Sequence, residues 1–425
     1  MALRSVLVLT YLFPPSSAAG THRLLGFSRH LPKYGWRCVV VAPPTLPWEP
    51  SDPALLDRLS PETTLYHVPY PSGAALKPLR KVAPYSVWLP AAWAACRRAI
   101  RDHRPAAIFT SGPPHVIHLL GRHIRRRTGL PWLADFRDPW RSAGALEDQS
   151  GWLRRWETWA EEAVFQDADC IIANTKGAQE ALSRAFPQHA AKMTAITNGY
   201  DVENFASIPI PVRDEAAFQI LHPGELYVNR DPEPFLKAIR SICPDDRGND
   251  RSIRVRFVGR SGPGAERLNG LIHSMGLDEV VASNGQIPYA QSLEEMVRAD
   301  LLLLLDSPGR RIGVPAKIFE YIGSNRPILA LAEPDGDVAR ILGESGAPHR
   351  IAAQHDVQGI AAALKELLSR PRSSRLVDGL QMRTPRFTRE ALSGSLANLL
   401  DSCLGQERRS AEAAPAATSL IEARR

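Results

Sequence analysis

The run LLLLLD at residues 301–306, followed by GVPAKIFEYIGSNRPILAL at residues 313–331, decides the fold of the second half of this chain. Five consecutive leucines predict a strand that is buried on both faces, as in parallel sheets covered by helices. Pro315 is typical of the first turn of a helix, and RPILAL at residues 326–331 predicts the next strand. Strand, helix and strand in this order predict a βαβ unit, with Lys317 and Glu320 one turn apart on its helix.

The same alternation of strands and helices extends through the rest of the chain. A strand at residues 5–13, the loop PPSSAAG and a helix at residues 21–30 open the first half, and a strand at residues 218–227 opens the second. We therefore predict an α/β protein with two Rossmann-like parallel-sheet domains in tandem. The predicted parts are domains at 1–205 and 206–387, a last helix at 388–404 and a disordered tail at 405–425.

The composition excludes several classes of protein. The 425 residues are 44% hydrophobic and 23% charged, which is ordinary for globular proteins, and no run of about 20 apolar residues predicts a membrane-spanning helix. The apolar run at residues 5–13 ends at Pro14 and Pro15 without a small-residue cleavage site, so we read it as a strand rather than a signal peptide. The five cysteines form no C-x-x-C motif, which favours a reducing cytoplasm over disulfides or zinc.

Positive charge and tryptophan are concentrated in the first half. Residues 1–200 hold 24 Lys and Arg against 15 Asp and Glu, and all nine tryptophans lie before residue 160. This pattern is typical of peripheral contact with the inner face of a membrane, or of an arginine-rich domain with tryptophan in its core. Nucleic acid is not an expected partner, because no known binding motif accompanies the charge. Trp152, Trp156 and Trp159 are spaced along one helical face, which we interpret as a core face, with a membrane anchor as the alternative.

Candidate site residues follow the predicted strands. Ligands of open parallel sheets bind beyond the carboxyl ends of the strands, and two such domains would face one another across a cleft. The second half delivers glycines, charged residues and the helix with Lys317 and Glu320 to these ends, and the first half delivers Gly20, residues 111–115 and residues 135–138. The candidate positions in the second half are Gly224, Arg230, Gly259, Asp306, Gly313, Val314, Lys317 and Glu320.

The second-half residues suit a nucleoside diphosphate. Glycines allow the backbone to approach phosphate closely, and a helix starting near Pro315 would offer unpaired N–H groups. Arg230 and Lys317 would supply positive charge, and Glu320 could accept both ribose hydroxyls. The alternative is that Lys317 and Glu320 form an ordinary solvated ion pair. Neither a G-x-G-x-x-G motif nor a Walker A loop is present, which argues against NAD binding and ATP hydrolysis.

Five segments together resemble the family 4 glycosyltransferases, which have the GT-B fold. They are TYLFPPSSAAGTHR, TSGPPH, ADFRDPW, TNGYDVENF and PAKIFEYIGSNRPILAL, and the similarity runs from about residue 5 to residue 404. The resemblance implies that the last helix crosses back to pack on the first domain. It also implies transfer of a sugar from a nucleoside diphosphate donor, most often a UDP-sugar, with retention and without a metal or cofactor. The implied acceptor is a glycan or a lipid-linked glycan.

The resemblance assigns roles to individual residues. It implies that Glu320 holds the donor ribose, Gly20 approaches the donor phosphate, Arg230 contacts the diphosphate and His115 lies near the reacting sugar. Lys317 would replace the phosphate-binding lysine of the family, whose usual position here is Phe235. His115 could instead bond backbone at a helix start, and we expect His118 to pack. Asp135, Arg137 and Asp138 could form an internal ion network, or Asp138 could contact the acceptor.

One departure from the family pattern concerns the sugar. The family has two glutamates, and the first would fall at Ile312. Its loss implies a deoxy donor, or recognition by Asp306, Arg310 or the backbone of Gly313. The alternatives to a transferase are a GT-B sugar-nucleotide epimerase, which needs no acceptor, and a non-catalytic GT-B scaffold that binds nucleotide.

Overall fold

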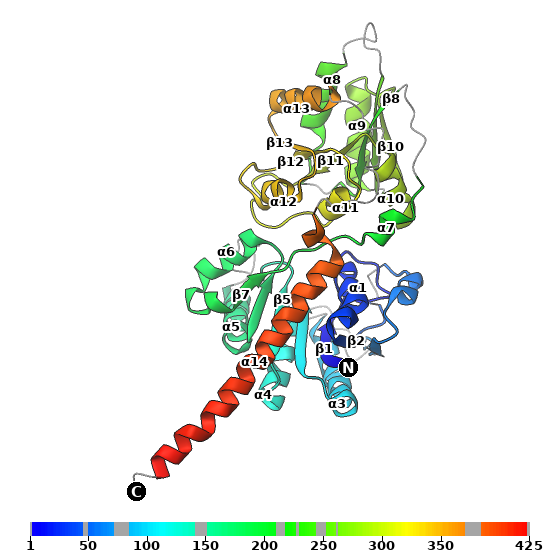
Figure 1. Ribbon diagram of the computed structural model, residues 1–425. Coiled ribbons are helices and arrows are strands. Elements are labelled where there is room, and N and C mark those ends of the chain that lie inside the picture. The colour runs from blue at the N-terminus through cyan, green and yellow to red at the C-terminus, as the bar shows by residue number, and fades with distance from the viewer. Residues whose placement is uncertain are drawn as a thin grey trace. The chain divides into compact units, whose positions relative to one another are not determined.

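The protein folds into two compact units, each built on one parallel sheet (Figure 1). The computed structural model describes residues 2–45, 50–71, 85–140, 151–209, 217–226, 229–243, 252–260, 262–369 and 384–422. The first unit comprises Met1–Asn198 with Arg389–Arg425, and the second comprises Gly199–Thr388. The units divide after Asn198, earlier than the boundary that the sequence predicted at residue 205.

The first unit contains a seven-stranded parallel sheet in the order β3-β2-β1-β4-β5-β6-β7. Its strands are β1 (Arg4–Thr10), β2 (Trp36–Ala42), β3 (Thr64–His67), β4 (Ala107–Gly112), β5 (Trp132–Phe136), β6 (Cys170–Ala173) and β7 (Met193–Ala195). Its α-helices are α1 (Thr21–His30), α3 (Leu89–His103), α4 (Ile117–Thr128), α5 (Gly151–Asp167), α6 (Lys176–Ala185) and α14 (Arg389–Glu422). Short 3-10 helices are η1 (Leu31–Tyr34), η2 (Pro53–Arg58), η4 (Ser86–Trp88) and η5 (Pro187–Lys192).

Helix α14 returns to the first unit after the chain has completed the second. It packs beside α1, and Leu396 and Leu400 of α14 share one apolar core with Leu24 and Phe27 of α1 and the strands beneath. Asp401 accepts a hydrogen bond from Trp36 Nε1 at 3.0 Å. The predicted return of the last helix is therefore confirmed. Helix α14 continues through the Ala- and Glu-rich segment to Glu422, where the sequence predicted a disordered tail from residue 405.

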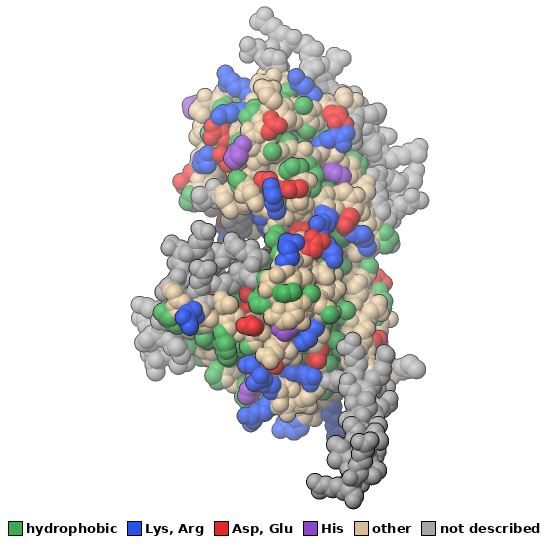
Figure 2. Space-filling view, turned by 90° about the vertical axis from the view of Figure 1, so that its left-hand side faces the viewer, with side chains coloured by type: hydrophobic (Ala, Val, Ile, Leu, Met, Phe, Trp, Pro, Cys, Tyr) green, Lys and Arg blue, Asp and Glu red, His purple; other side chains and the backbone are tan. Residues whose placement is uncertain are grey.

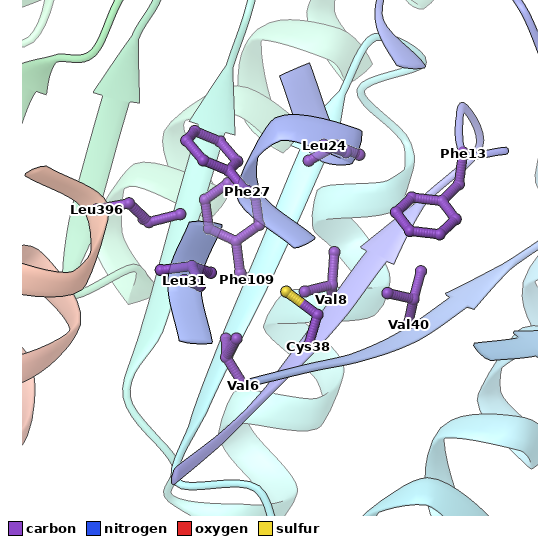
Figure 3. Close-up of a pocket in the computed structure, with 10 residues that line it drawn as sticks. All are labelled: Val6, Val8, Phe13, Leu24, Phe27, Leu31, Cys38, Val40, Phe109 and Leu396. Carbon is purple, nitrogen blue, oxygen red and sulfur yellow. The ribbon is translucent and has the colours of Figure 1, made fainter. Parts of the chain in front are cut away.

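A small cavity lies within the core beneath α1 and α14 (Figure 3). Its walls are entirely apolar, and the side chains that line it include Val6, Leu24, Phe27, Phe109 and Leu396. With room for about 10 Å³, it cannot admit a sugar or a nucleotide. The cavity is therefore a packing defect of the first unit and not a ligand site.

The second unit contains a six-stranded parallel sheet in the order β10-β9-β8-β11-β12-β13. Its strands are β8 (Ala217–Pro223), β9 (Ser252–Val258), β10 (Val281–Asn284), β11 (Leu301–Leu305), β12 (Ile328–Leu331) and β13 (His349–Ala352). Its helices are α7 (Glu203–Ala206), α8 (Glu233–Ile242), α9 (Pro263–Ser274), α10 (Tyr289–Arg298), α11 (Ile318–Gly323), α12 (Asp337–Ser345), α13 (Val357–Ser369) and the 3-10 helix η6 (Pro385–Phe387).

Strand β11 is buried on both faces, as its five leucines predicted. Leu301, Leu303 and Leu305 belong to the core on one face of the sheet. Leu302 and Leu304 belong to the core on the other face. Because successive side chains of a strand point to opposite faces, one leucine run supplies both cores. The prediction of two Rossmann-like parallel-sheet domains is confirmed in both units.

The tryptophans of α5 contradict the expected core face. Trp152, Trp156 and Trp159 have relative exposures of 70%, 40% and 55%. Helical periodicity places the three rings on one side of the helix but does not decide what covers that side. Over the described part of the chain, we find no helix long and apolar enough to cross a bilayer.

Candidate functional site

Two glycines meet at the carboxyl ends of β8 and β9 in the second unit. Gly224 follows β8 with a φ of +145°, and its N–H donates to Val258 O at 2.6 Å. A Cβ at Gly259 would lie 2.5 Å from Gly224 O, so the two backbones touch. This glycine-lined edge is where ligands of open parallel sheets bind, and it leaves the backbone accessible to a neighbouring group.

The neighbouring group is the ammonium of Lys317. A Cβ at Gly224 would lie 1.6 Å from Lys317 Nζ, so a side chain at position 224 would displace this ammonium. Lys317 Nζ is buried and has no hydrogen-bond partner among the described residues. An unpaired ammonium in a buried position is costly, because it loses water without gaining an acceptor. The position is therefore suited to a ligand that brings negative charge.

The buried position of Lys317 lowers its pKa to about 7. Burial is the largest cause, and the nearby Arg230 guanidinium lowers the pKa further. Glu320 and Glu225 act in the opposite direction and do not restore the usual value. Arg230, Lys317 and Glu320, which the sequence placed in one site, therefore lie close enough to interact. The simple solvated ion pair is excluded for Lys317, because its Nζ is not in water.

The helix that carries Glu320 begins later than predicted. Helix α11 starts at Ile318, with Lys317 as its N-cap, and it is six residues long. The N–H groups of Ile318 and Phe319 donate to Pro315 O and Ala316 O at 3.0 and 3.3 Å. The helix therefore begins three residues after Pro315, and the turn before it already uses these two donors. Arg230 and Lys317 supply positive charge here through their side chains.

Sequence reasoning missed His222, which is completely buried near the carboxyl end of β8. Its Nδ1 lies 2.8 Å from Leu303 O, so Nδ1 carries the proton and Nε2 is left with its lone pair. Burial lowers the pKa of His222 well below its usual value, and Lys317 and Arg230 lower it further. A neutral histidine thus borders the two cations. Within the strand, no sequence pattern distinguishes it from an ordinary buried residue.

The residues proposed to read the sugar in place of the missing glutamate are largely engaged. Asp306 is buried and pairs with Arg310, whose NH1 lies 3.1 Å from Oδ1. Burial raises the pKa of Asp306. The Gly313 N–H donates to Asp337 Oδ2 at 2.8 Å, so this donor is not available for a sugar hydroxyl. Recognition of the sugar by the backbone of Gly313 stays a prediction. The Val314 side chain packs in the core.

In the first unit, Arg137 binds the loop after β4. Its Nε donates to Gly112 O at 3.0 Å, and its NH2 donates to Pro113 O. A Cβ at Gly20 would lie 1.4 Å from Arg137 NH1, so a side chain at position 20 would displace this guanidinium from the start of α1. This supports the interpretation of Arg137 as a residue that fixes the loop. It also shows why a guanidinium can lie against the start of α1.

Asp135 forms the centre of a buried network with a different arginine. Arg23 Nε and NH2 donate to its two carboxylate oxygens at 3.0 and 2.8 Å, and Ser111 Oγ donates at 2.8 Å. Arg23 NH1 also donates to Thr197 O at 2.7 Å. The buried network therefore joins Asp135 to Arg23 and Ser111 and not to the predicted partners, because Arg137 donates to the backbone carbonyls of Gly112 and Pro113. Asp138 remains exposed at the end of β5.

His115 lies in a stack of rings beside this loop. Its ring is 5.5 Å from that of Phe136 and 5.3 Å from that of Trp140. Burial and the Arg137 charge lower the pKa of His115 to about 3, so the ring is neutral near pH 7. Its Nδ1 is buried and has no hydrogen-bond partner among the described residues. His118 is buried with Nδ1 2.8 Å from Thr110 Oγ1, which confirms that it packs.

Each unit thus presents its own set of polar groups at the carboxyl edge of its sheet. The second unit holds the cationic pair with Glu320, and the first holds neutral His115 beside Arg137. Within the described ranges, no cluster of three His, Cys, Asp or Glu side chains is arranged to hold a metal ion. The cationic pair, Arg230 and Lys317, can neutralise the charge of a bound polyanion.

The chain is similar to glycosyltransferases in both sequence and fold. Residues 20–199 match the family model described as "Glycosyl transferase 4-like domain". The D-inositol 3-phosphate glycosyltransferase of Gordonia bronchialis is 26% identical over 222 residues, which are 50% of this chain and 47% of that protein. The chain therefore spans about half the length of the curated relatives that it matches.

Solved structures of similar fold extend over nearly the whole chain. A sucrose-phosphate synthase from Thermosynechococcus elongatus covers 97% of this chain and all of its own, with a TM-score of 0.61 and 17% identity. HepE of Anabaena, solved in complex with UDP and glucose, covers 96% of this chain and all of its own, with a TM-score of 0.57 and 16% identity. These similarities establish the GT-B fold.

Proposed function

We propose that this chain, whose first domain belongs to the glycosyl transferase 4-like family and whose fold is GT-B, moves a sugar from a nucleoside diphosphate donor to an acceptor hydroxyl with retention. The observation that supports this most is Lys317, a buried ammonium without a hydrogen-bond partner in the described structure. It lies against Gly224 and is repelled by Arg230. A diphosphate would relieve that repulsion by placing negative charge beside both cations.

The two cations would act on the leaving group. As the bond between the sugar and the diphosphate lengthens, charge accumulates on the departing oxygen, and Arg230 and Lys317 stabilise it. The acceptor hydroxyl attacks from the same face, and the departing phosphate oxygen takes its proton. The proposal assigns charge neutralisation to these side chains rather than to a metal ion. Because water would hydrolyse the donor, the reaction also requires that the site exclude water.

The remaining groups would orient the donor and the acceptor. Glu320, in the first turn of α11, would accept hydrogen bonds from the ribose hydroxyls. His115 is neutral near pH 7, so it would hydrogen-bond the reacting sugar rather than protonate it. Asp138 is exposed and would contact the acceptor. We favour UDP as the nucleotide, because HepE, a protein of the same fold, has been solved with UDP and glucose.

Binding of UDP to Glu320→Ala and Glu320→Gln variants tests the donor site. We expect both variants to bind UDP at least tenfold more weakly than the wild type, because each loses the charged acceptor of the ribose hydroxyls. Isothermal titration calorimetry measures the affinity. Glu344→Ala is a suitable control, because Glu344 lies on the surface of α12, where it pairs with Arg386. Wild-type affinity in Glu320→Ala would refute the assignment of this site.

Product analysis separates the transferase from its alternatives. A transferase releases nucleotide in proportion to the glycosylated acceptor, an epimerase converts the donor alone, and a scaffold binds nucleotide without turnover. We expect a glycan or lipid-linked glycan acceptor to be required for turnover. We expect His115→Ala to lower kcat and to leave UDP affinity unchanged, and full turnover in this variant would remove His115 from the chemistry.

A further inference from the structure

Helix α5 presents a row of exposed tryptophans that the proposed reaction does not use. Trp152, Trp156 and Trp159 are 70%, 40% and 55% exposed and follow one another at four- and three-residue spacing. Large aromatic side chains that are exposed side by side are uncommon on a monomeric surface and mark an interaction site. We call these three residues the tryptophan face.

The tryptophan face is continuous with the rings around His115. The Trp156 ring is 6.4 Å from the Trp140 ring, and Trp140 stacks at 5.3 Å on His115. A partner seated on α5 would therefore lie next to the part of the first unit where we place the sugar chemistry. This continuity favours a partner connected with the acceptor.

Basic side chains border the tryptophan face. Helix α4 packs against both α5 and α3, and the Arg122 guanidinium lies 5.8 Å from the centre of the Trp159 ring. Helices α3 and α4 together hold seven arginines and one acidic residue, Asp102. Figure 2 shows basic and hydrophobic side chains intermixed over the first unit. Helix α5 itself carries acidic residues, and one of them, Asp167, is engaged with Arg122 and Arg126.

We infer that the tryptophan face docks on the surface of an anionic lipid bilayer. Indole rings combine an apolar body with a polar N–H group, and such rings concentrate at the level of lipid headgroups. Arginines beside them attract anionic headgroups. Each basic residue at the surface raises the affinity for an anionic bilayer by about fivefold. A second copy of the chain suits the face less well, because one helix face is far smaller than the area that a stable dimer buries.

The inference has two parts, docking on a bilayer and use of a lipid acceptor. The second part rests on the proposed function. If the protein is a glycosyltransferase, docking would bring His115 to the bilayer, and the acceptor would be a lipid-linked sugar or a lipid headgroup. Docking itself is independent of that chemistry. It can therefore be tested without donor, acceptor or turnover, and its failure would leave the donor site untouched.

Vesicle co-sedimentation of the full chain tests the docking. The probes are vesicles of phosphatidylcholine alone and vesicles with 30% phosphatidylglycerol, at low and at physiological salt. We expect binding to the anionic vesicles that is at least tenfold tighter than to the neutral ones and that weakens with salt. We expect Trp152→Ala/Trp159→Ala to bind the anionic vesicles at least tenfold more weakly than the wild type does. Arg127→Gln, at an exposed position of α4, should weaken that binding by about fivefold.

Controls keep the outcome interpretable. Tyr34→Ala removes another exposed aromatic residue, 38% exposed on η1, which packs on α14, and should bind vesicles as the wild type does. Circular dichroism should show wild-type melting temperatures for Trp152→Ala/Trp159→Ala and Arg127→Gln, because these side chains are exposed. Equal vesicle binding by the double tryptophan variant and the wild type would overturn the inference. A second outcome would also overturn it. In that outcome the wild type binds no vesicles and forms a dimer in light scattering, and the double variant does not form the dimer.

Discussion

At the scale of single residues, the arrangement of Lys317 against Gly224 is the feature with the clearest chemical consequence. The lysine lies 93 positions after the glycine, yet its ammonium fills the space that any Cβ would need. Its pKa of about 7 places the change of charge within the physiological range. A bound diphosphate would raise that pKa, because opposite charge nearby favours the protonated form. Donor binding and proton uptake should therefore be linked.

The first residue-scale prediction is a pH dependence of donor affinity. Below pH 7 the ammonium is already charged and the affinity of a UDP-sugar should be flat. Above pH 7 the protonated fraction falls tenfold per pH unit, so the affinity should fall by up to about tenfold per unit. Calorimetry in buffers of different ionisation enthalpy should show proton uptake at pH 7.5 to 8.

Two variants provide the control for this prediction. Lys317→Met should bind weakly at every pH and show no proton uptake. Arg230→Met should also bind weakly, but its pH dependence should move to higher pH, because removal of Arg230 raises the pKa of Lys317. A wild-type affinity that does not change between pH 6 and pH 9 would contradict the coupling of Lys317 to the diphosphate.

At the scale of elements, α14 supports the first unit from the far end of the chain. Leu396 and Leu400 are buried in the core beneath α1, and Leu396 also borders the small apolar cavity in Figure 3. Lys33 of η1 pairs with Glu390 at 2.8 Å, but both side chains are about half exposed and this pair contributes little. The apolar contacts are therefore what hold α14 to the unit.

The element-scale prediction is that Leu396→Ala destabilises the first unit by about 2–5 kcal/mol, because it removes buried methyl groups and enlarges the existing cavity. Tryptophan fluorescence during urea unfolding measures this selectively, since all nine tryptophans lie before residue 160 in the first unit. Leu399→Ala, at a partly buried position on the same helix, should lower the free energy of unfolding by less than Leu396→Ala does. An unchanged midpoint for Leu396→Ala would show that α14 does not stabilise the unit.

At the scale of the whole molecule, the two units carry different parts of the proposed reaction. The candidate phosphate-binding cations and Glu320 lie in the second unit, whereas His115, Asp138 and the tryptophan face lie in the first. A two-unit chain need not unfold in a single step, so probes that distinguish the units are informative. Calorimetry reports on both units, and tryptophan fluorescence reports on the first.

The whole-molecule prediction concerns the nucleotide. Among UDP, GDP and dTDP at about one hundred times the dissociation constant, we expect UDP alone to raise the calorimetric transition of the second unit, by about 5–10 °C. The tryptophan-monitored transition should move less than the calorimetric one. A shift with GDP only would change the donor class, and no shift with any of the three would argue against a nucleotide site.

The sequence by itself determined the alternation of buried strands and helices, and with it which residues lie at the carboxyl edges of the two sheets. Local patterns suffice for this, because the periodicity of strands and helices and the direction of parallel strands follow from neighbouring residues. Gly224, Arg230, Lys317 and Glu320 were found in this way. So were His115 and Asp135, although the partners of Asp135 were not.

Only the tertiary structure decided which of these side chains are paired and which are exposed. Asp306 is paired with Arg310 and the Gly313 N–H with Asp337, while Lys317 Nζ is buried beside a glycine from a distant strand. The tryptophans of α5 share one side, as the spacing predicted, but that side is open to solvent. Burial and pairing depend on what packs from elsewhere in the chain, and spacing along one segment carries no information about that neighbour.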